Sequence, residues 1–220
     1  MASTDSGKTY IVEHLDPELG PWSELEYICI GQDSQKTGSR FFLSSLPDEF
    51  RVPEKLSNLA SFTPEKRSVE EMYPPPPQGE ASSAGDVKNQ VCLLDPSAKK
   101  DLSPEDGDKF GVFLFGGILG DDPPRDRTSE LRKKGYEGRR LGPVQMTTDT
   151  AVRVTRMVVQ EGYTLDTVPY LDHPDIKFNE HESTQMPFRY VADSDGKPIM
   201  PEGMVELIGK DADKTIDDMF

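Results

Sequence analysis

VFLFGGILGDDPPRDRT, residues 112–128, is the stretch of sequence that decides the fold. Its unbroken apolar run, VFLF, is typical of a strand buried on both faces of a parallel sheet. Gly116, Gly117 and Gly120 follow, and glycine allows a backbone to approach a ligand closely. Open parallel sheets bind small molecules at the carboxyl ends of their strands, so the stretch predicts a ligand loop, with a ligand-free tight turn as the alternative. It has neither the glycine spacing of the dinucleotide fingerprint nor the lysine of a P-loop.

The segments around this stretch alternate between strand and helix patterns. Short apolar runs predict strands, and the recurrence of Trp22, Leu25, Ile28 and Cys29 after Pro21 predicts a helix. Such alternation is typical of an α/β domain with a parallel sheet, here a single domain over residues 1–220. Strands are expected at residues 10–12, 40–43, 91–94, 112–115 and 139–141. Helices are expected to begin at residue 21 and after a Ser103 cap with Pro104 in the first turn, and to span residues 125–134 and 148–160, with Gly162 ending the last one.

Two segments depart from this pattern. Residues 74–86 are rich in proline and small polar residues, with too little apolar surface to offset the entropy of ordering. They predict a mobile insertion, with a docking motif as the alternative. Residues 163–220 form a C-terminal extension in which FRYV and KPIM flank a Ser-Asp-Gly turn, a pattern that predicts a hairpin. The tail from Pro201 predicts a short acidic helix.

Composition and charge limit the class of function and the location. The chain has 25 Lys and Arg against 40 Asp and Glu, a net charge of −15, which repels nucleic-acid phosphates and favours a basic protein partner. Cys29 and Cys92 both lie in apolar runs, so we expect no disulfide framework and a reducing compartment. The longest apolar stretch is far shorter than the ~20 residues that span a bilayer, and no signal-peptide pattern is present. These features predict a cytoplasmic protein without membrane contact.

The histidines and cysteines do not have the spacing of a metal site. His14, His173 and His181 are scattered, with no short repeat that would place two ligands together. We therefore expect no metal. His14, at the end of the first predicted strand, is the only histidine expected near a substrate.

A second polar motif lies where a short strand meets the amphipathic helix. In RRLGPVQMTTDTAVRV, residues 139–154, Gly142 and Pro143 form a turn, and Thr147, Thr148 and Asp149 gather at the start of the helix. Thr and Asp are common helix caps, so capping alone is one interpretation. Free backbone N–H groups beside hydroxyl and carboxyl groups also suit the polar edge of a nucleoside, which is the other interpretation.

Taken in order, VCLLDP, FGGILGD and LGPVQMTTDTA resemble the three cofactor loops of SPOUT-class methyltransferases. Within that class, FGGILGDDPPRDRT, QMTTDTA, MPFRYV and GKPI are more similar still to the fungal SPOUT-fold protein arginine methyltransferases that act on a small-subunit ribosomal protein. The resemblance covers nearly the whole chain outside the proline-rich insertion. It implies a parallel sheet flanked by helices, with a C-terminal trefoil knot. The hydrophobic pattern of the sequence would not have predicted the knot, because chains that thread through a loop are rare.

The resemblance also implies a cofactor and its site. S-adenosylmethionine (SAM) would lie bent among the three loops, with Leu94, Ile118, Leu141 and Met146 as walls around the adenine. The full set of cofactor-binding residues that it implies is Leu94, Phe115, Gly116, Gly117, Ile118, Gly120, Leu141, Gly142, Gln145, Met146, Thr147 and Thr148.

One departure from the class concerns the substrate. RNA-modifying members usually carry an Asn- and Arg-containing motif near the start of the domain, whereas EHLDPELGPW, residues 13–22, has acids and no Arg. A guanidinium is protonated at neutral pH, so an enzyme that methylates it needs carboxylates to hold it and to take the released proton. Solvated acids and a core tryptophan are the alternative interpretation. We expect Glu13 and Asp121 as catalytic groups and His14, Trp22, Glu24, Glu26 and Asp122 as substrate contacts.

The implied activity is metal-free transfer of a methyl group from SAM to an arginine of a basic small-subunit ribosomal protein, the one with a KH domain. One alternative is an RNA methyltransferase, which the fold class favours and the net charge of −15 disfavours. The other is a non-enzymatic acidic chaperone of a ribosomal protein. Members of the class usually dimerise, but the segment beyond Gly162 has apolar side chains that must pack against another surface to be buried. These side chains predict a monomer in which the C-terminal extension covers the surface that other members of the class use to dimerise.

Overall fold

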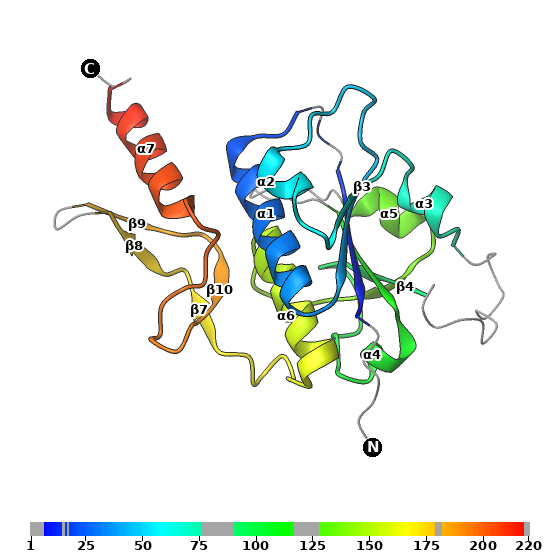
Figure 1. Cartoon of the computed structure of the whole chain (residues 1–220). Helices are drawn as coiled ribbons and strands as arrows, with labels where there is room; N and C mark the ends of the chain where they lie inside the picture. The colour runs from blue at the N-terminus through cyan, green and yellow to red at the C-terminus, as the bar shows by residue number, and fades with distance from the viewer. Residues whose placement is uncertain are drawn as a thin grey trace.

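A six-stranded sheet forms the centre of the protein (Figure 1). The computed structural model describes residues 7–14, 16, 18–75, 90–116, 128–178 and 182–217, with side chains described as far as residue 210. The strand order is β3-β2-β1-β5-β4-β6, and each pairing in this sheet is parallel, which confirms the predicted α/β fold with a parallel sheet. The strands are β1 Thr9–Glu13, β2 Arg40–Ser44, β3 Phe62–Pro64, β4 Val91–Leu94, β5 Val112–Phe115 and β6 Glu137–Arg139.

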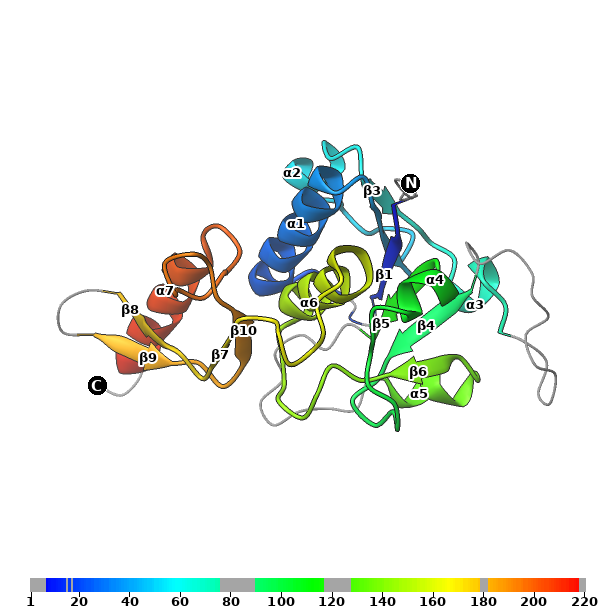
Figure 2. The same ribbon diagram turned by 90° about the horizontal axis from the view of Figure 1, so that it is seen from below.

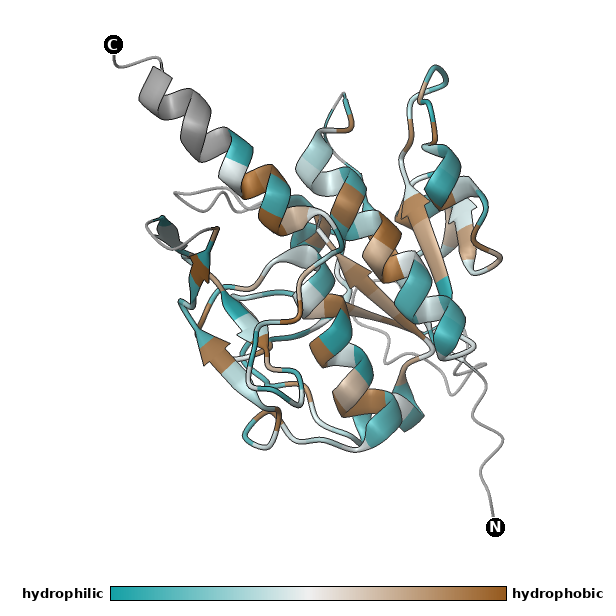
Figure 3. Ribbon diagram, turned by 60° about the vertical axis from the view of Figure 1, so that its left-hand side comes forward, coloured by the Kyte–Doolittle hydropathy of each residue, from teal (hydrophilic) through white to brown (hydrophobic). Residues whose placement is uncertain are grey.

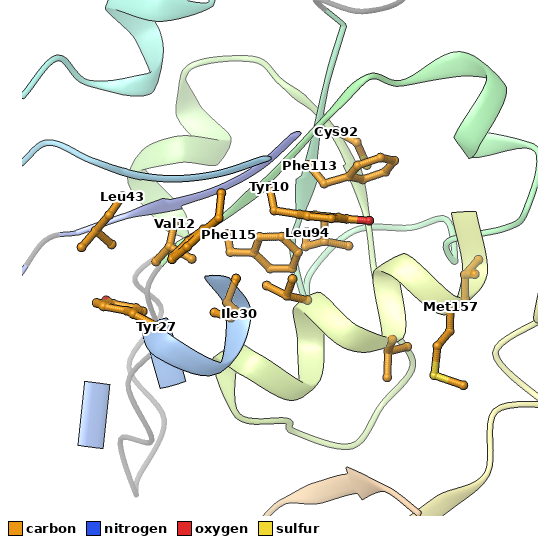
Figure 4. Close-up of a cluster of buried hydrophobic side chains, with 14 of the residues drawn as sticks. Tyr10, Val12, Tyr27, Ile30, Leu43, Cys92, Leu94, Phe113, Phe115 and Met157 are labelled. Carbon is orange, nitrogen blue, oxygen red and sulfur yellow. The ribbon is translucent and has the colours of Figure 1, made fainter. Parts of the chain in front are cut away.

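The sheet is buried on both faces, as its continuous apolar runs predict. Side chains alternate along β1, so Tyr10 and Val12 join one apolar cluster and Ile11 joins the other. Helices α1 (Pro21–Lys36) and α6 (Thr148–Glu161) cover the first face, where their side chains meet the aromatic and aliphatic side chains of the strands (Figure 4). The central strands are accordingly mostly apolar along their length (Figure 3). The shorter helices are α2 Glu54–Ser57, α3 Val69–Met72, α4 Asp106–Lys109 and α5 Ser129–Lys133.

The start and end of α6 are determined by local sequence signals. Its start lies at Thr148, as predicted, and Thr147 is the N-cap residue in an extended conformation. Gly162 follows its last turn with a φ of 78°, in the left-handed region that glycine adopts at little cost. Between these ends, buried Val152, Val154 and Val158 face the sheet, which confirms the predicted amphipathic helix.

The remaining elements form a C-terminal lobe, residues 163–178 and 182–217, which lies beside α1 and α6 (Figure 2). Its two small sheets are antiparallel pairs, β7 with β10 and β8 with β9. Trp22, at the start of α1, packs against the apolar cluster of the lobe, which includes Phe188 and Tyr190. The predicted tail helix is confirmed. The lobe consists of β7 Tyr170–Asp172, β8 Asp175–Lys177, β9 Ser183–Gln185, β10 Arg189–Val191 and α7 Met204–Asp217.

Two predicted strands differ from those observed. The predicted turn between FRYV and KPIM is present, with an antiparallel bridge between Ala192 and Pro198 and a hydrogen bond from the N–H of Ile199 to the carbonyl of Val191. KPIM does not form a strand, however, and the ladder of β10 is with β7. Pro198 has no backbone N–H, so it cannot extend a ladder of hydrogen bonds. The strand expected at 139–141 ends at Arg139, because the chain turns away through Gly142, whose φ is 93°.

Two predicted helices are shorter than expected. The helix predicted from Ser103 begins at Asp106 and lasts one turn, so its N-cap is Glu105, while the N–H of Ser103 donates to the Asp106 carboxylate at 3.0 Å. Of the helix predicted at 125–134, the structure shows Ser129–Lys133, and residues 125–127 lie outside the described residues. Of the proline-rich segment 74–86, only residues 74 and 75 are among the described residues. Within the described ranges, no helix has both the length and the apolar character needed to cross a membrane.

Candidate functional site

The carboxyl ends of β4 and β5 lie side by side in the sheet. Leu94, the last residue of β4, is the register partner of Phe115, the last residue of β5, and both are buried. Gly116 comes next, and a Cβ at this position would lie 3.0 Å from Cγ2 and 3.4 Å from Cα of Thr128. A side chain here would have to displace Thr128 by a few tenths of an ångström, so this close approach of two segments favours glycine. Three predicted cofactor residues are therefore together at the edge where parallel sheets bind ligands.

The 140–147 loop begins at the same edge and leads from β6 to α6. Arg139, at the end of β6, is the register partner of Leu94. Gly142 adopts the left-handed conformation, which turns the loop back toward α6. Leu141 and Met146 are half-buried and pack against the apolar cluster under α1 and α6, and Gln145 is half-buried as well. The loop thus places apolar side chains beside the ends of β4 and β5.

A side chain from α1 holds the first turn of α6. The N–H of Thr148 donates to Oε1 of Glu26 at 3.0 Å, while the Thr147 hydroxyl donates to that of Thr150 at 2.8 Å. Glu26 therefore caps α6 from the neighbouring helix, since Thr147 makes no capping hydrogen bond of its own. Glu26 is fully buried, and burial, followed by the charge of Asp149, raises the pKa of its carboxyl group well above the usual 4.5. Burial also raises the pKa of Asp149.

Arg189 on β10 connects the C-terminal lobe to the 140–147 loop. Its N–H donates to the carbonyl of Gln145 at 2.8 Å, and the two segments form a bridge at Met146. Its guanidinium donates to both oxygens of Asp172, at 2.5 and 2.8 Å, and lies 4.2 Å from the ring centroid of Tyr170. These hydrogen bonds lower the pKa of Asp172. The loop is consequently held by α1 on one side and by the lobe on the other.

Part of the predicted site lies outside the described residues. This part follows β5 and belongs to the stretch 117–127. It contains the expected catalytic Asp121 and the expected substrate contact Asp122, so the roles of both stay predictions. The residues concerned are Gly117, Ile118, Gly120, Asp121 and Asp122.

Glu13 is occupied by hydrogen bonds within the chain. Its carboxylate accepts the hydroxyls of Ser44 at 2.5 Å and Ser45 at 2.6 Å, and the N–H of Val69 at 3.1 Å. The side chain is buried, and its contacts join β1, the end of β2 and the start of α3. This arrangement favours a structural role over the predicted catalytic one, because the carboxylate is buried and both of its oxygens already accept hydrogen bonds within the chain.

The other expected substrate contacts within the described residues are His14, Trp22, Glu24 and Glu26. Glu26 has no exposed surface and caps α6, which favours a structural role over the predicted substrate contact. His14 is buried, with Nδ1 at 3.2 Å from the Tyr27 hydroxyl and its ring against Phe50, which favours a structural role. Trp22 packs on the C-terminal lobe, as the alternative interpretation of a core tryptophan expected. Glu24 is half-buried in the first turn of α1 and is the acid of this region that stays a candidate for substrate contact.

The sequence interpretation missed the residues that fix the 140–147 loop from outside. Asp149 and Arg153 are four residues apart on one helix, a spacing that does signal an ion pair. The pairing of Arg189 with Asp172 and with Gln145 joins separate elements, and no local spacing signals it. Among the described residues, no group of three His, Cys, Asp or Glu is placed to hold a metal ion.

A parallel sheet with glycine turns and half-buried apolar loops at the carboxyl ends of its strands is typical of α/β proteins that bind a small molecule at that edge. The sequence profile of the family described as "Protein arginine N-methyltransferase SFM1-like" matches residues 9–215. The chain belongs to this family. The resemblance inferred from the sequence motifs is thereby confirmed.

Individual relatives agree with this assignment. Protein arginine N-methyltransferase SFM1 of Saccharomyces cerevisiae is 43% identical to the chain over 221 residues, which cover 96% of this chain and 99% of the yeast protein. The crystal structure of the yeast enzyme complexed with SAM has a TM-score of 0.78 and 40% identity, covering 93% of this chain and 91% of the other. The complex with S-adenosylhomocysteine (SAH) has a TM-score of 0.77 and 40% identity, covering 91% and 94%.

Proposed function

We propose that this protein binds SAM at the carboxyl edge of its sheet and transfers the methyl group to an arginine of a basic small-subunit ribosomal protein. The observation that carries the proposal is the position of the 140–147 loop, which Glu26 and Arg189 hold beside the ends of β4 and β5. The relatives described above as SAM and SAH complexes support the choice of cofactor.

The residues at this edge suit an adenosyl group. A purine needs flat apolar surroundings and a few polar partners at its rim. Leu94, Leu141 and Met146 supply apolar surface, while Thr147 and Thr148 add hydroxyl groups at the start of α6. Gly142 keeps a side chain out of the turn between them. When bound, SAM supplies an electrophilic methyl group on a sulfonium centre.

Acidic groups of the chain would hold and deprotonate the substrate. A guanidinium is a poor nucleophile because its lone pair is delocalised and it carries a proton, which methylation releases. A carboxylate can orient the fork and accept that proton. We assign these tasks to Glu24, Asp121 and Asp122, and we leave Glu13 out because the chain itself uses both of its oxygens. The net charge of −15 attracts a basic partner and repels RNA.

The proposal extends to the organisation of the molecule. We infer a single SPOUT domain with a C-terminal trefoil knot, working as a cytoplasmic monomer. The parallel sheet supports the fold class. The packing of the C-terminal lobe against α1 supports the monomer, because it covers helix surface that a partner would need.

Labelled methyl transfer tests this function. The purified protein is incubated with radiolabelled SAM and isolated small ribosomal subunits, and the products are split into protein and RNA. We expect the label in one basic protein, recovered as monomethylarginine after hydrolysis. Label in the RNA would support the RNA methyltransferase instead. SAH binding without any transfer would support the acidic chaperone.

A further inference from the structure

Three carboxylates and one guanidinium lie between α1 and α6, next to the 140–147 loop. Glu26 and Asp33 belong to α1, and Asp149 and Arg153 belong to α6. Arg153 donates to Asp33 at 2.6 Å and lies 3.6 Å from Asp149. Glu26 has no exposed surface and Asp149 has 3%. One buried positive charge therefore faces three acids, which is too little to neutralise all of them.

Hydrogen bonding within the buried acid pair, Glu26 and Asp149, points to an added proton. Oε1 of Glu26 accepts the N–H of Thr148. Oε2 of Glu26 and both carboxylate oxygens of Asp149 make no hydrogen bond of full geometry within the described part of the chain; the Trp22 side chain near Glu26, and the Thr147 side chain and Thr150 backbone near Asp149, are the donors that partly offset this by lowering the pKa values. The Asp149 carboxyl group neighbours Glu26 and, after burial, is the group that raises the pKa of Glu26 most. Buried acceptors without donors are costly, and a proton on either acid supplies the missing donor.

Cys29, Tyr190 and Arg153, which surround the pair, keep the same protonation state near neutral pH. Cys29 and Asp33 face the pair from α1, Arg153 from α6 and Tyr190 from β10. Burial raises the pKa of Cys29 to about 12 and also raises the pKa of Tyr190, so the thiol and the phenol stay neutral. Arg153 stays charged, and Asp33 is already bound to it. The acid pair is therefore the part of this cluster that exchanges a proton.

We propose that Glu26 and Asp149 share one proton and are positioning residues for the cofactor. With the proton in place, Glu26 holds the N–H of Thr148 and thereby the end of the 140–147 loop. Without it, two adjacent buried negative charges repel each other and weaken this contact. The inference rests on cofactor binding at the 140–147 loop and is independent of which molecule accepts the methyl group.

The pH dependence of SAH binding tests the shared proton. The folded-state pKa of both acids lies above the unfolded value, so their stabilising contribution is full at low pH and declines as the pH rises through the folded values. Calorimetry from about pH 6 to about pH 9 should show falling SAH affinity in the natural protein. Glu26→Gln keeps an acceptor for Thr148 and gives Asp149 a permanent donor, so its affinity should match the natural protein at low pH and stay nearly constant.

A truncation and a matched control complete the test. Glu26→Ala removes the acceptor of Thr148 and should bind SAH about tenfold more weakly over the whole pH range. Glu54→Gln and Glu54→Ala make the same changes at an exposed site on α2 and should keep the natural profile. The titration of SAH itself is common to all variants and cancels in the comparison.

Two results would overturn the inference. A Glu26→Gln profile as steep as the natural one would exclude the shared proton, and natural SAH affinity in Glu26→Ala would exclude the positioning role. If Glu26→Ala does not fold, the profile of Glu26→Gln decides alone. Failure of methyl transfer to ribosomal protein, with these SAH profiles as expected, would contradict the proposed substrate and leave this inference intact.

Discussion

Glu13 is an acid whose role follows from its neighbours. Its residue type and its position at the end of a strand suit a catalytic base, and the sequence alone therefore predicts one. The observed partners are two serine hydroxyls at the end of β2 and a backbone N–H at the start of α3. At the scale of the residue, the chemistry of a side chain can be predicted from sequence, whereas its occupation by distant donors cannot.

Replacing Glu13 should therefore lower stability first. Glu13→Ala leaves the buried N–H of Val69 without an acceptor and leaves the Ser44 hydroxyl only a long hydrogen bond to the Val12 carbonyl, so we expect a loss of about 3 kcal/mol in the free energy of unfolding. Urea denaturation measures it, with Glu49→Ala, at an exposed position, as the control that changes it by less than about 0.5 kcal/mol. Unchanged stability together with lost methyl transfer would restore the catalytic role.

Gly142 gives a second prediction at this scale. Gly142→Ala puts a Cβ on a residue in the left-handed conformation, which costs about 1 kcal/mol of backbone strain. The free loop can relieve this strain by changing its conformation, so SAH binding must then pay the strain energy to restore the turn. We expect SAH affinity to fall about fivefold in calorimetry. Gly135 has nearly the same φ, 94° against 93°, and open space around it, so Gly135→Ala is a matched control that should bind SAH normally. Equal affinities would show that the turn at Gly142 does not shape the site.

Strand β10 acts on the 140–147 loop through the contacts of Arg189. Asp172→Asn keeps the shape of its partner and removes the charge, and the Asp172 side chain is 42% exposed. We therefore expect the free energy of unfolding to change by less than about 1 kcal/mol and SAH affinity to fall about twofold. The pKa of Asp172 is lowered, so the ion pair is present above the usual carboxyl range and is lost only as pH falls through the folded value.

The control for this element removes a pair far from the loop. Asp48→Asn breaks an exposed ion pair with Lys66 and should leave SAH affinity unchanged in the same calorimetric measurement. If Asp172→Asn also binds SAH as the natural protein does, the lobe does not position the loop through this ion pair.

The elements of the sheet domain could be predicted because burial on both faces leaves continuous apolar runs, as in residues 91–94 and 112–115. Strands β7, β8 and β9 have three residues each and mixed composition, so no periodic pattern marks them. The site followed the same division. The place of Leu94 at the end of β4 and of Gly142 in the loop after β6 could be predicted from motifs, whereas the capping of α6 by Glu26 depends on how two helices pack.

The whole molecule is expected to be monomeric. The C-terminal lobe buries Trp22 and covers part of α1, and a net charge of −15 opposes self-association. Light scattering at several concentrations should give a mass near 24.5 kDa. A doubled mass that persists on dilution would show that the lobe leaves a dimer surface open.

The central position of β1 affects how the chain is made. Its partner β5 lies about one hundred residues further along the sequence, so the two strands meet only after half of the protein has left the ribosome. Until then, β1 and β2 expose an apolar edge that another nascent chain can join. The pace of translation and the chaperones that cover this edge should therefore limit the yield of folded protein more than the stability of the finished sheet does.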